Sequence, residues 1–236
     1  MVKPNALHHL ALSTGDMKTQ IEFFTDVLGM ELVALYWMHG VEGAWHGFLK
    51  LNNNCAVAFV HTGKNQQIDP VMGVSHAGNP GESSAPGTMQ HLALNVDSTA
   101  DLMAMRDRIR SRGVPVFGPI HHGFCSSIYF AGPENLSLEV ATSADVEHPL
   151  SSDMWIDPEV AALAGISAED IKRYKAPASY DGANGDVPQP EYDASKPHQF
   201  YPKEVYDLML GTPDEALTQA ASETTPPGLA SASKQQ

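Results

Sequence analysis

Apolar and polar residues follow the same pattern twice along this chain. The tetrapeptide His-Leu-Ala-Leu begins an alternating apolar segment at His9 and again at His91. Residues 16–28 and 98–112 come next, with apolar residues spaced as on one face of a helix, and a glycine directly follows each segment. Glycine suits the left-handed position that ends a helix. Each copy is therefore predicted to begin with a strand and a helix.

Three more strands are expected in each copy. They cover about residues 31–38, 45–51 and 56–61 in the first, and about residues 116–121, 126–130 and 136–142 in the second. A turn signal joins the last two strands of each copy, at residues 52–54 and 132–135, because Asn and Gly tolerate left-handed backbone. The order β-α-β-β-β therefore occurs twice.

We predict an α+β fold of two tandem β-α-β-β-β modules, at about residues 5–62 and 88–144. The segment between them is rich in Gly, Pro, Ser and Asn, and is typical of a long surface loop. A four-stranded sheet with one helix has an uncovered face, so two such sheets side by side can form a cleft. Equivalent residues of the two modules are then expected to face each other across it.

Charge divides the chain near residue 145. The 236 residues have a net charge of −14; residues 1–144 hold 12 acids and 8 bases, whereas residues 145–236 hold 16 acids and 6 bases. We therefore predict a compact domain over residues 1–144 and an acidic, mostly irregular or helical extension over residues 145–236.

Short helices are expected within the extension. Caps at Asp157 and Ser167 predict two of them, the second ending near Lys175. Residues 202–210 predict another, and the composition from Thr212 onward indicates a frayed or disordered end. The extension could wrap its own domain, cover the cleft or clasp a second subunit, and we expect a homodimer or higher homo-oligomer.

Composition excludes several classes of protein. The acidic charge argues against nucleic acid binding, which needs a basic surface. No apolar run is long enough to span a membrane, and the first residues do not form a secretory signal. The two cysteines, Cys55 and Cys125, exclude a disulfide framework and are consistent with the cytoplasm.

Three residues are candidates for a metal site. His9 and His91 hold equivalent positions in the two copies, and Glu139 lies in an otherwise apolar strand, where alternation places it on one face with Ser137. Each also has a plainer interpretation, as a hydrogen-bonded histidine at a strand edge or a solvent-facing glutamate. Two histidines and one carboxylate form a facial triad, which leaves three metal positions open and suits non-haem Fe(II).

The doubled module, with His-Leu-Ala-Leu at both first strands, resembles the vicinal-oxygen-chelate superfamily. This superfamily includes glyoxalase I, bleomycin-resistance proteins and type I extradiol dioxygenases. The stretch S-I-Y-F-A-G-P-E-N-L-S-L-E at residues 127–139 is similar to the closing hairpin of the family. The resemblance covers about residues 5–143 and is closest in pattern to the extradiol dioxygenases.

The resemblance implies which reaction to expect. Glyoxalase I-like members add a fourth ligand, an acid on the last strand of the first module, but residues 56–60 offer no acid and His61 could enter only by a register shift. The dioxygenase pattern asks for His, His and Glu, which are present as His9, His91 and Glu139.

The resemblance also implies substrate-contacting groups near the metal. A histidine before the closing hairpin matches His122 or His121, with His122 favoured, and a tyrosine in the hairpin matches Tyr129. The family's usual acid–base histidine has no counterpart, because Asn54 and Cys55 occupy that region. Another histidine could serve in its place, or the substrate differs from an ordinary catechol; the candidates are His39, His46, His61 and His76.

These inferences together predict an Fe(II)-dependent dioxygenase, with Mn, Zn and Ni as alternative metals. It would use O₂ to cleave the ring of a catechol- or hydroquinone-like aromatic, with Trp37, Trp45, Phe48 and Phe124 as candidate pocket walls. Two alternatives stay open. One is a glyoxalase-type metal-dependent lyase or isomerase, and the other is a metal-free protein that sequesters an aromatic ligand.

Overall fold

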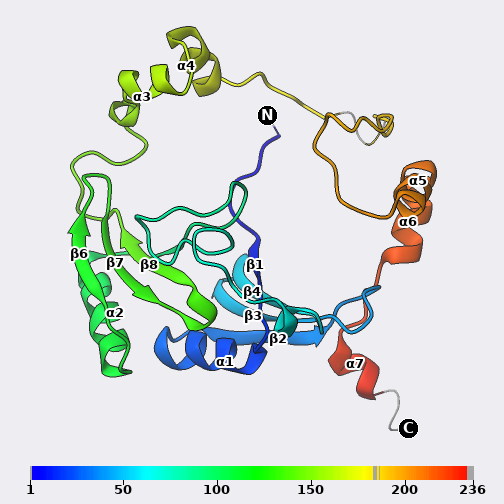
Figure 1. Ribbon diagram of the computed structural model, residues 1–236, viewed down its shortest axis with the longest axis horizontal. Helices are drawn as coiled ribbons and strands as arrows, with labels where there is room; N and C mark the ends of the chain where they lie inside the picture. The colour runs from blue at the N-terminus through cyan, green and yellow to red at the C-terminus, as the bar shows by residue number, and fades with distance from the viewer. Residues whose placement is uncertain (1, 183–184, 186, 233–236) are drawn as a thin grey trace. The chain divides into compact units, whose positions relative to one another are not determined.

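The computed structural model describes residues 2–182, 185 and 187–232 (Figure 1). By their internal contacts the residues group into two units. One comprises residues 6–35 and 43–177, and the other comprises residues 1–5, 36–42 and 178–236. Both predicted modules, apart from a short stretch at residues 36–42, lie in the first of these units.

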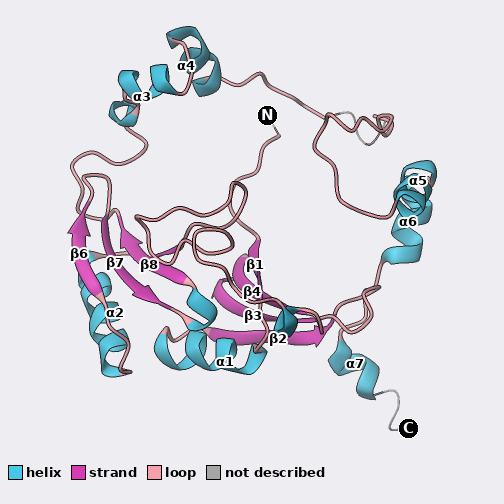
Figure 2. Ribbon diagram, in the orientation of Figure 1, coloured by secondary structure: helices cyan, strands magenta, loops and turns pink. Residues whose placement is uncertain are grey.

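Module 1 is a four-stranded mixed sheet with one helix (Figure 2). Its elements are β1 (His9–Ser13), α1 (Met17–Glu22), β2 (Glu31–Trp37), β3 (Trp45–Asn52) and β4 (Cys55–His61). The strand order is β1-β4-β3-β2, with β1 parallel and β3 antiparallel to β4. The prediction for this half of the repeat is confirmed.

Module 2 repeats this topology. Its elements are β5 (Leu92–Asn95), α2 (Thr99–Ser111), β6 (Phe117–His121), β7 (Ser126–Ala131) and β8 (Ser137–Thr142). The order β5-β8-β7-β6 again pairs the first strand in parallel with the last. Between the modules, the loop contains one 3-10 turn, Asn65–Gln67.

Strand register divides each sheet into two faces. In both modules one face carries a row of apolar side chains that packs toward the helices. These rows are Leu10, Val57 and Leu49 in module 1 and Leu92, Leu138 and Phe130 in module 2. The other face, called here the helix-free face, carries the predicted site residues, because side chains alternate along a strand.

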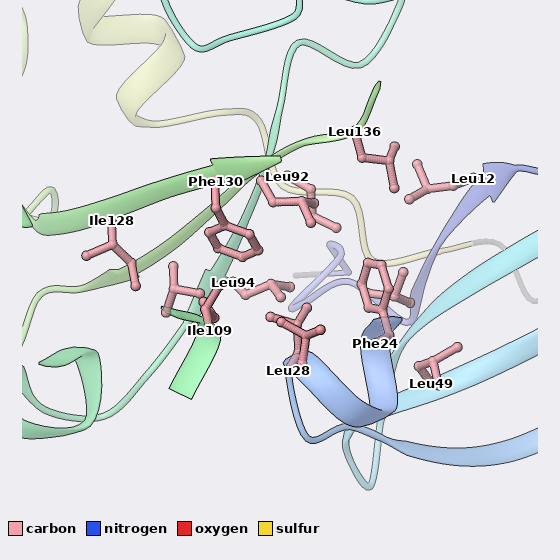
Figure 3. Packing of buried hydrophobic residues seen from close by; sticks show 14 of the residues in the cluster. Leu12, Phe24, Leu28, Leu49, Leu92, Leu94, Ile109, Ile128, Phe130 and Leu136 are labelled. Carbon is pink, nitrogen blue, oxygen red and sulfur yellow. The ribbon is translucent and has the colours of Figure 1, made fainter. Parts of the chain in front are cut away.

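The two modules share one hydrophobic core (Figure 3). Its buried side chains come from both sheets and both helices, and include Leu12, Phe24, Leu28, Leu94, Leu102, Ile109 and Ile128. The rings of Phe24 and Phe59 meet edge-on, with centroids 5.0 Å apart. Burying one such side chain contributes about 1.5–3 kcal/mol, so the modules stabilise each other.

The predicted first helix changes form halfway along. It begins as α1, capped by the Asp16 carboxylate, which accepts a hydrogen bond from the Thr19 amide, and continues as a π-helical turn, η1 (Phe23–Val27). The wider turn brings the amide of Leu28 to the carbonyl of Phe23, and Gly29 then ends the helix at φ 79°. Periodicity predicted the helix but not this local change.

Polar contacts also join the modules. Glu134, in the hairpin before β8, has left-handed backbone at φ 54°. Its carboxylate accepts hydrogen bonds from the Gly15 amide at 2.7 Å and from the Gln20 side-chain amide at 2.7 Å. On the helix side, the Arg108 guanidinium donates to the Val27 carbonyl at 2.8 Å. The relative position of the two modules is therefore fixed by both apolar and polar contacts.

Short helices follow β8, as predicted for the extension. They are η4 (Asp153–Trp155), α3 (Pro158–Leu163), α4 (Ala168–Lys175), α5 (Lys203–Gly211), α6 (Asp214–Ala221) and α7 (Pro227–Ala232). The caps at Asp157 and Ser167 form as expected. The expectation of a disordered end is wrong for α6, because alanines and acidic residues in the first turn favour the helix. No helix in the described part of the chain combines the length and apolar character needed to cross a bilayer.

Candidate active site

One row of residues crosses the helix-free face of module 2. The register places Phe117 opposite Tyr129, Tyr129 opposite Glu139, and Glu139 opposite Ala93. His91 precedes Ala93 by two residues and points to the same face. The face therefore brings a phenol, a carboxylate and an imidazole close together, with the exposed ring of Phe117 at the end of the row.

His91 and Glu139 are in direct contact. Nε2 of His91 lies 3.0 Å from Oε2 of Glu139, and the carboxylate side chain is 8% exposed against 33% for the imidazole. The other ring nitrogen of His91 hydrogen-bonds the side-chain oxygen of Gln90. With Nδ1 donating to that oxygen, Nε2 faces the carboxylate with its lone pair unless a proton or a cation lies between them.

This arrangement fits a metal ion by its chemistry. A histidine that ligates a metal commonly donates its second ring N–H to an oxygen, which fixes the ring and its tautomer, as Gln90 can do here. A buried carboxylate needs a compensating positive charge, and a divalent cation bound between the carboxylate and the imidazole would supply it. Sequence reasoning missed Gln90, although its position directly before His91 was a usable signal.

His9 lies on the helix-free face of module 1. It borders a hollow of about 380 Å³ whose other walls include Phe48, Lys50, Asn54 and Cys55. The rings of His9 and Phe48 are 5.7 Å apart, and Nδ1 of His9 is 2.9 Å from Nδ1 of His8. Among the described residues, no three His, Cys, Asp or Glu side chains are grouped to hold a metal. A single chain thus joins His91 to Glu139 without adding His9.

Strand pairing identifies the counterparts of the site in module 1. Ala58 corresponds to Glu139, and Phe48 corresponds to Tyr129, because each pair holds equivalent positions in the two registers. Ala58 is buried and offers no ligand. His61 is engaged elsewhere, with Nδ1 3.1 Å from the Thr14 carbonyl. The two faces are therefore chemically unequal.

Among the histidines of module 1, His46 is the one whose pKa is clearly lowered by its surroundings. Burial, and secondarily the nearby His9, lowers the pKa of His46 below its usual value, so its imidazole is neutral at neutral pH. Its ring contacts Phe48 at 4.8 Å between centroids. Of the other histidines considered as acid–base groups, His76 contacts Ser75 and His39 belongs to the second unit of the chain.

His122 and Tyr129 form a hydrogen-bonded pair on module 2. Nε2 of His122 lies 2.8 Å from the phenol oxygen of Tyr129. Burial raises the pKa of Tyr129 above 10, and the charge of Glu139 raises it further, while a hydrogen bond with Ser127 opposes the change. The phenol is therefore neutral at neutral pH. His121 points elsewhere, with Nδ1 2.7 Å from the Ser126 hydroxyl.

The candidate pocket aromatics separate into two groups. Phe124 lies beside the His122 ring, at 6.3 Å between centroids, and Phe48 lies beside His9. Trp45 packs against the core and the ring of His61, and Trp37 is mostly exposed. The structure thus places Phe124 and Phe48 next to predicted site residues, whereas Trp45 is a core residue.

Comparison with known proteins identifies relatives over one part of the chain. The sequence pattern of the Glyoxalase/Bleomycin resistance protein/Dioxygenase superfamily matches residues 6–140, more than half of the chain. A biphenyl-2,3-diol 1,2-dioxygenase of Rhodococcus globerulus is 22% identical over 134 residues, which cover 57% of this chain and 61% of that enzyme. A probable lactoylglutathione lyase of Synechocystis is 25% identical over 139 residues, which cover 57% of this chain and 92% of that protein.

Solved structures resemble the same part of the chain. A glyoxalase/bleomycin resistance protein/dioxygenase domain from Frankia aligns with 60% of this chain and 99% of its own length, at 14% identity and a TM-score of 0.46. A lactoylglutathione lyase from Agrobacterium tumefaciens aligns with 59% of this chain, at 21% identity, a TM-score of 0.41 and 95% coverage of its own length.

Proposed function

Because the chain belongs to the glyoxalase/bleomycin resistance protein/dioxygenase superfamily, we propose that it is a non-haem Fe(II)-dependent dioxygenase of the extradiol type. Its substrates would be O₂ and a catechol- or hydroquinone-like aromatic. The observation that carries the proposal is the helix-free face of module 2, where His91 contacts Glu139 and His122 contacts Tyr129. Two of the proposed metal donors and the proposed proton-transferring pair thus lie on one face.

The metal would be held by His9, His91 and Glu139. Since one chain does not group all three, we propose a homodimer in which His9 of a second copy completes the site. A two-fold axis would place the helix-free face of module 1 in one copy against that of module 2 in the other, twice per dimer. The unequal faces then complement each other.

The side chains near this site would control protons and orientation. When bound, Fe(II) would supply Lewis acidity and electron transfer between substrate and O₂. The neutral phenol of Tyr129 can donate a hydrogen bond to a substrate oxygen, and His122 can accept a proton from a substrate hydroxyl and hold it at Nε2. Phe117 and Phe124 offer apolar surface to an aromatic ring.

A glyoxalase-type lyase is the second candidate function. This chain matches 92% of the length of the probable lactoylglutathione lyase from Synechocystis, but only 61% of the length of the dioxygenase from Rhodococcus globerulus. The counterpart of Glu139 in module 1 is Ala58, so a four-ligand set with an acid from each module does not form. This register favours three protein ligands and therefore the dioxygenase.

Metal analysis of protein purified without oxygen tests the proposal. We expect about one iron per chain, its loss in His91→Ala, and O₂ uptake with catechols or hydroquinones. Zinc, nickel or manganese in place of iron would favour the lyase. Protein that binds no metal at all would overturn both enzyme functions and leave an aromatic-ligand-binding protein.

Mixing two inactive variants tests the shared site. His9→Ala and His91→Ala each remove one donor, but a mixed dimer contains one complete set of three. Random mixing after dissociation should therefore restore about one quarter of the wild-type metal content. No restoration in a verified mixed dimer would show that each site is built within one chain.

Location and partners complete the proposal. Cys55 and Cys125 are both free thiols, which supports the reducing cytoplasm as the location. The partners we propose are a small aromatic substrate, O₂ and a second copy of the chain. The Mn, Zn and Ni alternatives are separated from Fe by the metal analysis described above.

A further inference from the structure

The first part of the acidic extension folds back onto the loop between β6 and β7, residues 122–125, which carries His122. Trp155 lies against Gly123, so closely that a Cβ on this glycine would come within 2.6 Å of Cη2 of the indole. The backbone of Gly123 is left-handed, at φ 83°. The Trp155 ring also meets Phe124 edge-on, with centroids 5.4 Å apart. These contacts join a residue beyond the family match to the loop that carries His122.

Two hydrogen bonds hold this contact in place. The indole Nε1 of Trp155 donates to the carbonyl of His148 at 2.8 Å, which fixes the ring over the loop. The hydroxyl of Ser143, just after β8, donates to the carbonyl of Phe124 at 2.8 Å. The indole is therefore anchored to its own segment, and that segment is bonded separately to the loop.

The conformation of this loop determines where the His122 ring lies relative to Tyr129. The amide of His122 donates to the carbonyl of Cys125 at 2.8 Å, closing a tight turn around Gly123 and Phe124. The imidazole lies between the Phe124 ring and Tyr129, with centroids 6.3 Å and 6.1 Å away. His122 is otherwise solvent-exposed, so a free loop would allow it several rotamers.

We propose that Trp155 is a positioning residue that holds the loop of His122, and thereby keeps the imidazole within hydrogen-bond reach of Tyr129. Its effect on turnover rests on the proposed function, whereas its effect on the geometry does not. The acidic extension thus supplies part of the active-site architecture. Position 123 therefore requires glycine, because only glycine leaves room for the indole and adopts the observed backbone without strain.

Histidine-detected NMR on the full-length, metal-free protein tests the geometry. The ring signal of His122 is assigned by its loss in His122→Ala, and its shift on Tyr129→Phe measures the contact between the two side chains. We expect Trp155→Ala to abolish this response to Tyr129→Phe, and Trp155→Phe, which retains an aromatic ring, to restore at least about half of it. Tyr174→Ala serves as the control, because this exposed aromatic contacts Arg173 and should leave the response unchanged.

Gly123→Ala gives a second, independent test from the opposite side of the contact. Its methyl group would displace the indole without removing it, and the backbone strain at φ 83° acts in the same direction, so the His122 amide should exchange with solvent faster than in the wild type. The increase should be smaller when Gly123→Ala is made in Trp155→Ala, where no indole remains to be displaced. The single Gly123→Ala variant keeps the proposal testable if Trp155→Ala fails to fold, which far-UV circular dichroism would reveal. An unchanged Tyr129 response in folded Trp155→Ala, or unchanged exchange in folded Gly123→Ala, would overturn the positioning role.

Turnover separates this proposal from the proposed function. If both hold, Trp155→Ala lowers kcat by about 10- to 100-fold with iron content unchanged, because a small displacement of a proton-transferring group is costly. Suppose that Trp155→Ala abolishes the response of the His122 signal to Tyr129→Phe, but the wild type has no dioxygenase activity. The positioning role would then stand and the proposed function would be rejected. If Trp155→Ala lowers turnover but keeps the normal response of the His122 signal, the positioning role is rejected.

Discussion

Module 1 and module 2 have the same strand order, and the register of β1, β4 and β3 matches that of β5, β8 and β7. Of the two, module 2 carries the contacts of His91 with Glu139 and of His122 with Tyr129. At equivalent positions Glu139 stands in module 2 and Ala58 in module 1, and Tyr129 stands in module 2 where Phe48 stands in module 1. The first-strand histidine is present in both. A repeated scaffold thus fixes where side chains lie, whereas a few substitutions decide which chemical groups each copy presents on its helix-free face.

The helix-bearing faces show the opposite relation. They are equally apolar in the two modules and merge into one core, in which Leu49 and Leu138 are both fully buried. The two inner faces are therefore alike, as packing into one core requires, while the helix-free faces differ. Variants of three kinds test this contrast between the modules: in the core, at the equivalent residues Tyr129 and Phe48, and in the helix caps.

The largest effect is expected in the shared core. Leu49→Ala in module 1 and Leu138→Ala in module 2 should each lower the free energy of unfolding by about 2–5 kcal/mol, because each leaves a cavity among buried neighbours. Since the core spans both modules, each variant should still unfold in one transition in urea, followed by fluorescence and circular dichroism. Two separate transitions would show that the modules are stabilised independently.

A smaller and more selective effect is expected from exchanging the counterpart aromatic residues. Tyr129→Phe removes the phenol that contacts His122, and should lower kcat by about 100-fold if the pair transfers a proton during the reaction. Phe48→Tyr adds a phenol at the equivalent place in module 1, beside His9, and should lower kcat much less than Tyr129→Phe does, because it leaves the phenol of Tyr129 in place. Equal losses in the two variants would mean that both faces contribute to the reaction in the same way.

The smallest effect concerns the caps of the two module helices. Asp16 caps α1 with a carboxylate, and hydrogen bonds from the Thr19 hydroxyl and amide lower the pKa of Asp16 below its usual 3.8. Ser98 caps α2 with an uncharged hydroxyl. Folding favours the ionised Asp16, so its contribution is present above pH 3.8 and is lost as the pH falls through the lowered folded-state value.

Thermal unfolding of the two cap variants measures this difference. Asp16→Ala should be less stable than the wild type near pH 6, and the gap should close in acid. Ser98→Ala should lose about 1 kcal/mol without that closing in acid. A gap for Asp16→Ala that stays constant down to pH 3 would contradict the assignment of the titrating cap.

Local patterns predicted most of the fold. The bounds of β3 and β4 lie within one residue of prediction, because alternation and the intervening asparagines are local signals. The face of Glu139 was predicted for the same reason. The sequence could not show that one chain separates His9 from the His91–Glu139 pair, because contacts distant in sequence, such as Arg108 with the Val27 carbonyl, set the position of the modules.

Some features of the site have no local signature. The choice between His121 and His122 depends on which ring the loop turns toward Tyr129, and the structure pairs His122 with it. Trp155 lies 32 residues after Gly123, and nothing in its neighbourhood indicates that contact. The prediction of a disordered end from Thr212 was based on composition alone, and composition did not reveal the helix α6.

The shared core has a consequence for how such a chain could be divided. One module alone would expose the apolar side chains that the other now covers, and could hide them only against a second polypeptide. A chain cut within residues 68–88 should therefore yield two fragments that remain associated and are recovered as a complex. The repeated His-Leu-Ala-Leu marks the two halves as one repeated unit in which each half covers the apolar face of the other and presents a different outer face.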